Sequence, residues 1–239
     1  MTSKQKKVNE TSDGPTNEYY KSGNRRYQGV YKDGQKYGLW TEWYDNEGND
    51  LESEGEFAIN DNGMSMKTGI WTTWHRSGFL ESEGEYNSVN GQRMGKWSFW
   101  YVSDDDDNIQ SLEPQSECYY DGNGVAQGMW KTWYRNNCNG DKYCGKSRIK
   151  SEEVYVDGKA HGPWTYYHKN GIISSKGRFV NGKRQGLWEE YYDNGQIQSQ
   201  GTYVDTKMHG MWQFWNASND KSGYTSRIES YYNNFQVVD

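Results

Sequence analysis

The sequence contains few of the aliphatic residues that fill a conventional protein core. Only 32% of its 239 residues are hydrophobic, and aromatic residues, at 16%, supply half of that share. A two-layer domain of this length needs more apolar surface, so a conventional globular core is not expected. With 12 Trp and 21 Tyr in the chain, burial must come from flat rings packed on backbone. Each ring can cover roughly 150–250 Å², which favours a thin sheet.

Long apolar runs are also missing. The sequence has no stretch of 18 apolar residues, and residues 1–13 are polar. Neither a membrane-spanning helix nor a secretory signal is therefore expected. These features predict a cytoplasmic protein whose residues 1–13 form a disordered tail.

What the sequence does contain is an internal repeat. The motif Gly-x-Trp occurs seven times at spacings of 24 to 34 residues, and an eighth, degenerate copy without its tryptophan begins at Gly14. Each unit of such an array buries its apolar side only against its neighbours, so the repeat decides the fold. We predict one repeat domain over residues 14–239, with inserts near 102–118 and 136–148. Its repeats start near Gly14, Gly38, Gly69, Gly95, Gly128, Gly162, Gly186 and Gly210.

Two turn signals alternate within each repeat. Asn170-Gly171 and Asn194-Gly195 mark one edge, whereas Asp33-Gly34, Asp157-Gly158 and Asn181-Gly182 mark the other. Two-residue loops of this composition favour hairpin turns, because both central residues need positive φ. The predicted fold class is all-β: an elongated single-layer antiparallel sheet of about eight tandem β-hairpin repeats.

These turns predict a register. If Asn170-Gly171 closes a two-residue turn, then Lys169 pairs with Ile172, Trp164 lies opposite Gly177 and Gly162 lies opposite Phe179. The turn at Asn181-Gly182 would then place Gly177 opposite Gly186. In this arrangement each recurring glycine lies beside another glycine or beneath a ring that covers its bare backbone.

Strict alternation along the strands then sorts the side chains onto two faces. The packed face is predicted to hold the tryptophans of the Gly-x-Trp motifs, called anchor tryptophans below. The rings expected beside them are Phe57, Tyr86, Tyr119, Tyr155, Phe179 and Tyr203. The aliphatic residues expected on the packed face, each followed two residues later by serine, are Leu51, Leu80, Ile109, Ile149, Ile173, Ile197 and Ile228.

The opposite, open face carries polar residues and a second aromatic row. We predict that this face binds a partner, since exposed rings on a polar face are typical of interaction surfaces. Glutamates that alternate along two strands, Glu52, Glu54, Glu56, Glu81, Glu83 and Glu85, are assigned to the same face. The predicted partner-binding residues are Trp43, Trp74, Trp100, Trp133, Tyr167, Tyr191, Trp215, Glu52, Glu54, Glu81 and Glu83.

The glutamates leave two interpretations open. Adjacent like charges destabilise a sheet, so solvent must separate them or a basic partner must neutralise them. The acidic patch argues against nucleic acid and makes an anionic membrane an unfavourable partner, because both require clustered Lys and Arg.

Residues that could carry chemistry are sparse. His161 and His209 occupy the same repeat position roughly 19 Å apart, too far to share a zinc ion. Cys138 and Cys144 could close a small loop, although reduced thiols fit a cytoplasmic protein better. The run Asp104–Asp107 lacks the ligand spacing of a calcium loop and is interpreted as a solvated turn. No catalytic motif is present, and we expect neither enzymatic activity nor a cofactor nor a metal.

The extended pattern Gly-x-Trp-x-x-[Tyr/Trp]-[Tyr/His]-x-Asn-Gly, followed by Gly-x-[Tyr/Phe]-x-[Asp/Asn]-Gly-Lys, resembles the MORN repeat. It is most similar to the bacterial variant found in proteins described as antitoxin components of toxin–antitoxin systems. The resemblance implies a twisted single-layer sheet, self-association, and scaffolding or partner binding, and phosphoinositide binding has been suggested for the family. The sequence departs from the pattern at Glu117 and Glu153, where glycine is expected.

We therefore expect a non-catalytic protein-binding repeat scaffold, with an antitoxin-like inhibitor of a partner protein as its specific form. Unpaired edges near Tyr19 and Tyr231 would also allow a homo-oligomer. Two alternatives stay open: a membrane-associated scaffold and a carbohydrate or cell-wall binding module. Choline-binding repeats are aromatic hairpins too, but they place Trp and two Tyr consecutively, whereas two residues separate Trp188 from Tyr191 here.

Overall fold

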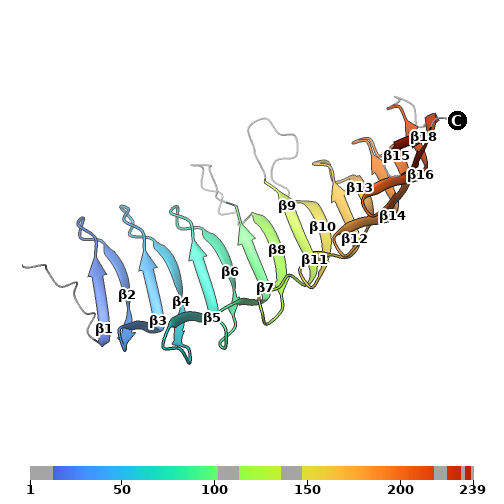
Figure 1. Cartoon of the computed structure of the whole chain (residues 1–239). Helices are drawn as coiled ribbons and strands as arrows, with labels where there is room; N and C mark the ends of the chain where they lie inside the picture. Colours follow the sequence, from blue (N-terminus) through green and yellow to red (C-terminus); the bar gives the residue numbers. More distant parts are fainter. Residues whose placement is uncertain (1–12, 102–112, 136–146, 218–224, 233–234, 238–239) are drawn as a thin grey trace, which may run out of the picture. The chain divides into compact units, whose positions relative to one another are not determined.

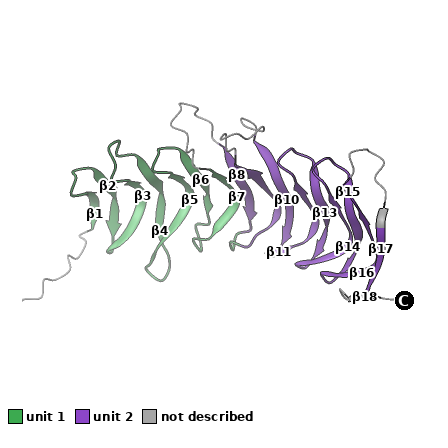
Figure 2. Cartoon of the chain, turned by 90° about the horizontal axis from the view of Figure 1, so that it is seen from above, with its two compact units in different colours: residues 1–112, 122–124 green, residues 113–121, 125–239 purple. Residues whose placement is uncertain are grey.

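The computed structural model describes residues 13–101, 113–135, 147–217, 225–232 and 235–237. These residues form eighteen β-strands and no helix, which confirms the predicted all-β class. The chain divides into two compact units, residues 1–112 with 122–124 and residues 113–121 with 125–239 (Figure 2). The predictions for residues 1–12, for Asp104–Asp107 and Ile109, and for Cys138 and Cys144 lie outside the described residues.

The first unit is an open antiparallel sheet in which each strand pairs with the next along the chain. Consecutive hairpins of the unit lie side by side in Figure 1. Its strands are β1 (Gly14–Tyr19), β2 (Arg25–Lys32), β3 (Gln35–Trp43), β4 (Leu51–Ile59), β5 (Ser65–Trp74), β6 (Leu80–Tyr86) and β7 (Arg93–Trp100).

The second unit repeats this hairpin order. A short break at His161 separates β11 from β12, and both pair with β10. Its strands are β8 (Pro114–Tyr120), β9 (Gly128–Tyr134), β10 (Arg148–Val156), β11 (Lys159–Ala160), β12 (Gly162–Tyr167), β13 (Ile173–Val180), β14 (Lys183–Tyr191), β15 (Ile197–Val204), β16 (Lys207–Trp215), β17 (Thr225–Tyr232) and β18 (Phe235–Val237).

The predicted two-residue turns are confirmed at one edge of the sheet. Asp33-Gly34, Asp157-Gly158 and Asn181-Gly182 all have positive φ at both residues. The equivalent turn between β15 and β16 is Asp205-Thr206, with φ of 50° and 70°. A left-handed conformation costs an ordinary residue roughly 1–2 kcal/mol. At Thr206 the hydroxyl oxygen accepts the Arg184 amide at 3.1 Å, which offsets part of this strain.

At the other edge the predicted turn is wrong. The His168 amide donates to the Ile172 carbonyl at 2.7 Å and the Gly171 amide donates to the His168 carbonyl at 2.8 Å, so the loop has three residues. A bulge beside the loop then shifts the register between Tyr166 and Tyr167. Because the bulge compensates for the longer loop, the predicted pairs farther along the strands, Trp164–Gly177 and Gly162–Phe179, are confirmed.

A second irregularity explains the Gly-x-Trp motif. Between paired positions of β13 and β14, Gly177 alone lies opposite residues 186–188. Gly186 has a φ of 75°, a conformation in which glycine carries no steric penalty. The ring of Trp188 then lies on Gly177, where a Cβ atom would overlap it. The predicted pairing of Gly177 with Gly186 is therefore wrong, because the wide bulge puts the tryptophan in that place.

The region expected to be an insert near 102–118 is shorter than predicted, because β8 begins at Pro114. Likewise β10 begins at Arg148, the last residue of the second predicted insert. In β8 the buried Cys118, rather than Glu117, takes the position that glycine has in other repeats. The carbonyl of its neighbour Tyr119 still accepts the indole N–H of Trp130 at 3.1 Å.

Candidate functional site

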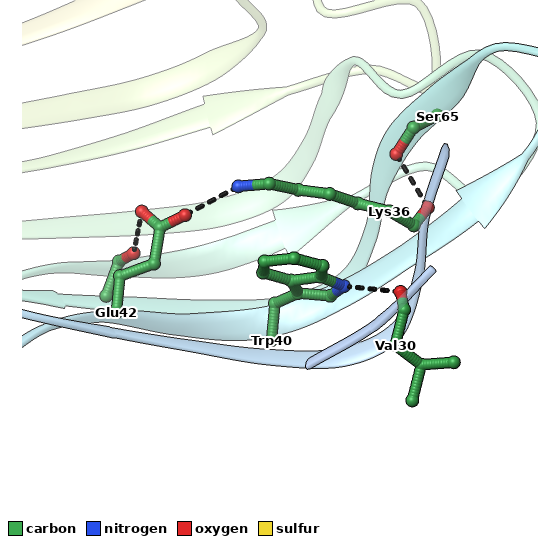
Figure 3. Close-up of polar contacts among 6 residues, drawn as sticks. Val30, Lys36, Trp40, Glu42 and Ser65 are labelled. Carbon is green, nitrogen blue, oxygen red and sulfur yellow. Dashed lines mark hydrogen bonds and ion pairs between the residues drawn. The ribbon is translucent and has the colours of Figure 1, made fainter. Parts of the chain in front are cut away.

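The packed face is held by the anchor tryptophans. Each indole N–H donates to a carbonyl of the preceding strand, as Trp40 does to Val30 at 3.1 Å (Figure 3). Trp97, Trp188 and Trp212 make the same bond to Glu85, Arg178 and Thr202. A buried donor left without a partner would cost about 1–3 kcal/mol, so this bond lets a polar indole serve as core. The anchor tryptophans that are buried are Trp40, Trp71, Trp97, Trp164, Trp188 and Trp212.

Aromatic rings of intervening strands continue this core. Phe57 meets Trp40 and Trp71 edge to face, with ring centroids 6.2 and 5.1 Å apart. Such contacts contribute about 0.5–1.5 kcal/mol beyond burial. In the second unit Tyr120, not the predicted Tyr119, packs on Trp130 at 5.4 Å, because Cys118 rather than Glu117 takes the glycine position. Ile228 is also misassigned to this face, since it is 59% exposed and pairs with Gln213.

Cations cover the outer side of several anchor rings. Lys36 lies 4.4 Å from the Trp40 ring centre and reaches the carboxylate of Glu42 at 2.6 Å (Figure 3). Lys67 lies 3.9 Å from Trp71, and burial lowers its pKa. Cation–π contacts of this kind contribute about 0.5–2 kcal/mol, depending on desolvation. The packed face is therefore occupied by its own side chains.

Tyrosine hydroxyl groups link neighbouring repeats. The Tyr44 hydroxyl donates to the Trp74 carbonyl at 2.9 Å, and the Tyr134 hydroxyl donates to the Tyr167 carbonyl at 2.6 Å. Tyr20 and Tyr192 make equivalent bonds. Neutral phenols are needed for this donation, and burial is the first cause of the raised pKa of Tyr20, Tyr44 and Tyr134.

These raised pKa values predict alkaline destabilisation. In the unfolded chain a tyrosine loses its proton near the ordinary pKa of 10.0, whereas the folded protein keeps it. The unfolded state therefore binds fewer protons above that pH, and stability present below it is lost as pH rises through the folded pKa. We expect the urea midpoint to fall between about pH 9 and pH 11.

The matched control is the double variant Tyr44→Phe/Tyr134→Phe. It lowers stability at neutral pH because two hydrogen bonds are lost, but its midpoint should depend less on alkaline pH. Absorbance titration of phenolate in folded and urea-unfolded protein gives the two pKa distributions directly. Identical titration curves would contradict the assignment.

A bulge near the end of each hairpin redistributes the predicted residues between the faces. Trp43 pairs with Leu51, and Glu42 pairs with Ser53, so Glu52 is the extra residue. A one-residue bulge moves side chains to the other face of the sheet. Leu51 consequently lies on the open face, where it lines a pocket together with Trp43. The other aliphatics paired with rings in this way are Leu80, Ile149, Ile173 and Ile197.

The same bulge divides the predicted glutamates. Glu52 has no partner in the strand ladder, and burial and then the charge of Glu42 raise its pKa. Glu81 lies 3.8 Å from Nδ1 of His75. Glu54 and Glu83 instead pair with Thr41 and Thr72, which share the open face with Trp43 and Trp74. The bulges therefore interrupt the alternation that assigned Glu52 and Glu81 to the open face, and the partner-binding role of these glutamates stays a prediction.

The second aromatic row lies on the open face but is only half-buried, not fully exposed. Five of these rings pair with an aliphatic residue of the next strand, whereas Trp215 pairs with Thr225. Arg25 lies 5.0 Å from the Trp43 ring, and Lys176 lies 5.5 Å from that of Tyr191. The seven half-buried residues of this row are Trp43, Trp74, Trp100, Trp133, Tyr167, Tyr191 and Trp215.

A different row is the most exposed apolar feature of the open face. It consists of the middle residues of the Gly-x-Trp motifs, which alternate with the second aromatic row and share its face. In the first unit Leu39 is 57% and Ile70 is 69% exposed, and in the second unit Leu187 is 58% and Met211 is 73% exposed. We call Leu39, Ile70, Met129, Leu187 and Met211 the aliphatic row. Its sequence signal is an apolar residue at x in five of seven motifs, in a chain with few aliphatics.

Charge distinguishes the open faces of the two units. In the second unit Lys131 pairs with Glu152 at 3.2 Å and Lys176 with Glu189 at 2.9 Å. In the first unit Glu56, Glu83 and Glu85 are exposed. Among the residues that the structure covers, no ion pair reaches these three carboxylates. The first unit therefore presents uncompensated negative charge beside Ile70.

Similarity to a known family covers part of the chain. The family model described as MORN repeat variant matches residues 160–181 and 184–205. These two segments are similar to the MORN repeat variant. They contain β12, β13 and β15, most of β14 and Ala160 of β11. The same ring-on-glycine contact recurs at Gly29, Gly55 and Gly84 of the first unit. A comparison with curated proteins gave no match.

MORN repeats are generally protein- or membrane-binding modules. The described ranges of this chain include no helix that could cross a membrane. Over the same ranges, His, Cys, Asp and Glu side chains form no group of three that could hold a metal ion.

Proposed function

We propose that this chain is a MORN-type repeat protein and a non-catalytic module that binds a protein partner through its open face. The aliphatic row is the observation that carries the proposal. Leu39, Ile70, Leu187 and Met211 are each more than half exposed, although the chain has few aliphatic residues to bury. Burial of such a side chain contributes roughly 1.5–3 kcal/mol, so a partner gains affinity from each of these side chains that it covers.

The half-buried rings have a supporting role in this proposal. Trp43 and Tyr191 already contact a cation and a paired aliphatic residue, which leaves less of each ring free for stacking on a sugar. Their packing instead holds the strands that present Leu39 and Leu187. The antitoxin-like role stays a prediction that rests on the sequence resemblance alone.

The test replaces the aliphatic row without touching the packed face. We expect the variant Leu39→Asn/Ile70→Asn/Leu187→Asn/Met211→Asn to keep its urea midpoint, because exposed side chains contribute little to folding. Its affinity for a partner identified by crosslinking to the open face should fall at least about thirtyfold, equivalent to about 2 kcal/mol.

The matched control is Met64→Asn/Val89→Asn. These residues are 56% and 80% exposed, but they lie in hairpin loops outside the aliphatic row. Full binding by the control and loss by the row variant would support the open face. Equal binding by both variants would remove the open face from the proposal.

A further inference from the structure

Resting on the proposed function, we propose that the open face of the first unit takes a basic amphipathic helix lying across strands β3 to β6. The helix would present apolar residues at i and i+7 and Lys or Arg in the turns between them. Three features of this face lead to the assignment: its uncompensated charge, the spacing of its apolar residues, and a shallow pocket beside Leu39.

The charge of the face selects a basic partner. Glu56 and Glu85 lie opposite Leu39 and Ile70 in the strand ladders, and Glu83 lies on the same face as Glu85. Their carboxylates are exposed and have no ion pair in the described part of the chain. In the second unit Lys131 and Lys176 pair with Glu152 and Glu189, whereas these three glutamates of the first unit form no such pair among the described residues, so a basic partner could supply the complementary cations. Anionic lipid and nucleic acid would be repelled.

The spacing of the face selects a helix. Leu39 lies on β3 and Ile70 on β5, so their strands are about 9.6 Å apart at the usual separation. Glu56 on β4 lies halfway between the strands of Leu39 and Ile70, and Glu85 on β6 lies one strand beyond Ile70. Seven residues of α-helix rise about 10.5 Å and return to the same helix face, with i+3 and i+4 one turn along. An extended segment repeats its side chains about every 6.8 Å, which does not match.

A shallow pocket supplies the first contact. It has a volume of about 340 Å³, and its lining combines the apolar residues Val30, Leu39, Trp43 and Leu51 with polar ones such as Gln28, Thr41 and Glu54. A leucine or isoleucine of the helix at position i would contact the apolar part of this depression. The next apolar residue, at i+7, then reaches Ile70, and Lys or Arg at i+3 or i+4 reaches the carboxylate of Glu56.

The experiment uses the full chain and a synthetic helix of about 18 residues, long enough to span the four strands. The probe peptide has Leu at i, i+7 and i+14, Lys at i+3, i+4, i+10 and i+11, and Ala or Gln elsewhere. Two further peptides serve as controls, one of the same composition in scrambled order and one with Glu in place of Lys. Binding is measured by fluorescence anisotropy, and helix formation by circular dichroism.

We expect micromolar binding of the probe peptide that weakens at least about tenfold between roughly 50 and 300 mM salt. Glu83→Gln/Glu85→Gln should weaken binding about tenfold. The matched control Glu47→Gln/Asp61→Asn removes the same charge from exposed positions of the same unit and should bind as the unchanged protein does. Vesicles of phosphatidylcholine and phosphatidylserine should not bind.

Equal binding of the scrambled peptide, equal weakening by both pairs of substitutions, or binding to the anionic vesicles would overturn the proposal. If the probe peptide does not bind, the helix proposal fails. The proposed function, protein binding through the open face, still stands if the aliphatic-row variant loses its crosslinked partner. If the peptide binds and the row variant keeps that partner, the partner uses another surface and the proposed function fails.

Discussion

Gly84→Ala is expected to lower the free energy of unfolding by about 3 kcal/mol. A Cβ atom at this position would overlap the indole of Trp97, and the indole is held in place by its bond to the Glu85 carbonyl and by contact with Tyr86. Overpacking of this kind typically costs about 1–3 kcal/mol, because the ring must leave its site or the strands must separate. Urea unfolding followed by circular dichroism measures the change.

Gly95→Ala in the same repeat is the matched control. Gly95 has a φ of 62° and no atom within 4 Å of its Cβ position, so only backbone strain opposes the substitution. We expect a loss of about 1 kcal/mol. Gly84 is not among the glycines with positive φ, so a loss at Gly84 no larger than that at Gly95 would contradict the close approach of the Trp97 ring.

Trp97→Leu is expected to lower stability by about 3 kcal/mol. Trp97 is only 2% exposed, and the substitution removes ring volume from the packed face and leaves the Glu85 carbonyl without the indole N–H. Cavity formation and a lost buried hydrogen bond each contribute on the order of 1–3 kcal/mol. The urea midpoint again provides the measurement.

Trp100→Leu, in the same strand, separates the two aromatic rows. Trp100 is half-buried on the open face, so its replacement should cost only about 1 kcal/mol. A loss as large as that of Trp97→Leu would mean that both rows form the core. The distinction between packed and open faces would then be incorrect.

The regular part of this fold could be predicted from the sequence. The pairs Trp164–Gly177 and Gly162–Phe179 follow from turn residues and from the need to cover bare backbone. Turns such as Asn181-Gly182 are encoded by residues that tolerate positive φ. These signals are local. They are sufficient to predict strand pairing here because each strand pairs with the next one along the chain.

The bulges could not be predicted, and they account for the errors. Counting alternate residues assumes an unbroken ladder, whereas each hairpin has an extra residue such as Glu52. One extra residue in a strand moves the side chains on one side of the bulge to the opposite face of the sheet. Leu51 thereby moves to the open face. Whether a bulge forms depends on how the ring and the loop pack together, and no single residue type predicts it.

The face on which the candidate residues lie could be predicted in part, whereas their partner-binding role stays a prediction. Alternation places Trp43 and Trp74 on the open face, and the pairing of Thr41 with Glu54 and of Thr72 with Glu83 agrees with that prediction. Half-burial of those rings could not be read from the sequence, because it arises from paired aliphatics across a bulge. The aliphatic row, by contrast, has a sequence signal, because Leu39 and Ile70 stand between the glycine and the tryptophan of their motifs.

The contact between anchor ring and glycine is most directly tested by a double-mutant cycle of Gly84→Ala and Trp97→Leu. Each single variant should lose about 3 kcal/mol, but alanine has room once the indole is gone, so the double variant should lose only about 3–4 kcal/mol. The coupling of about 2 kcal/mol or more would then locate the ring on the glycine. A double variant that loses about 6 kcal/mol, the sum of independent sites, would contradict this account of the repeat.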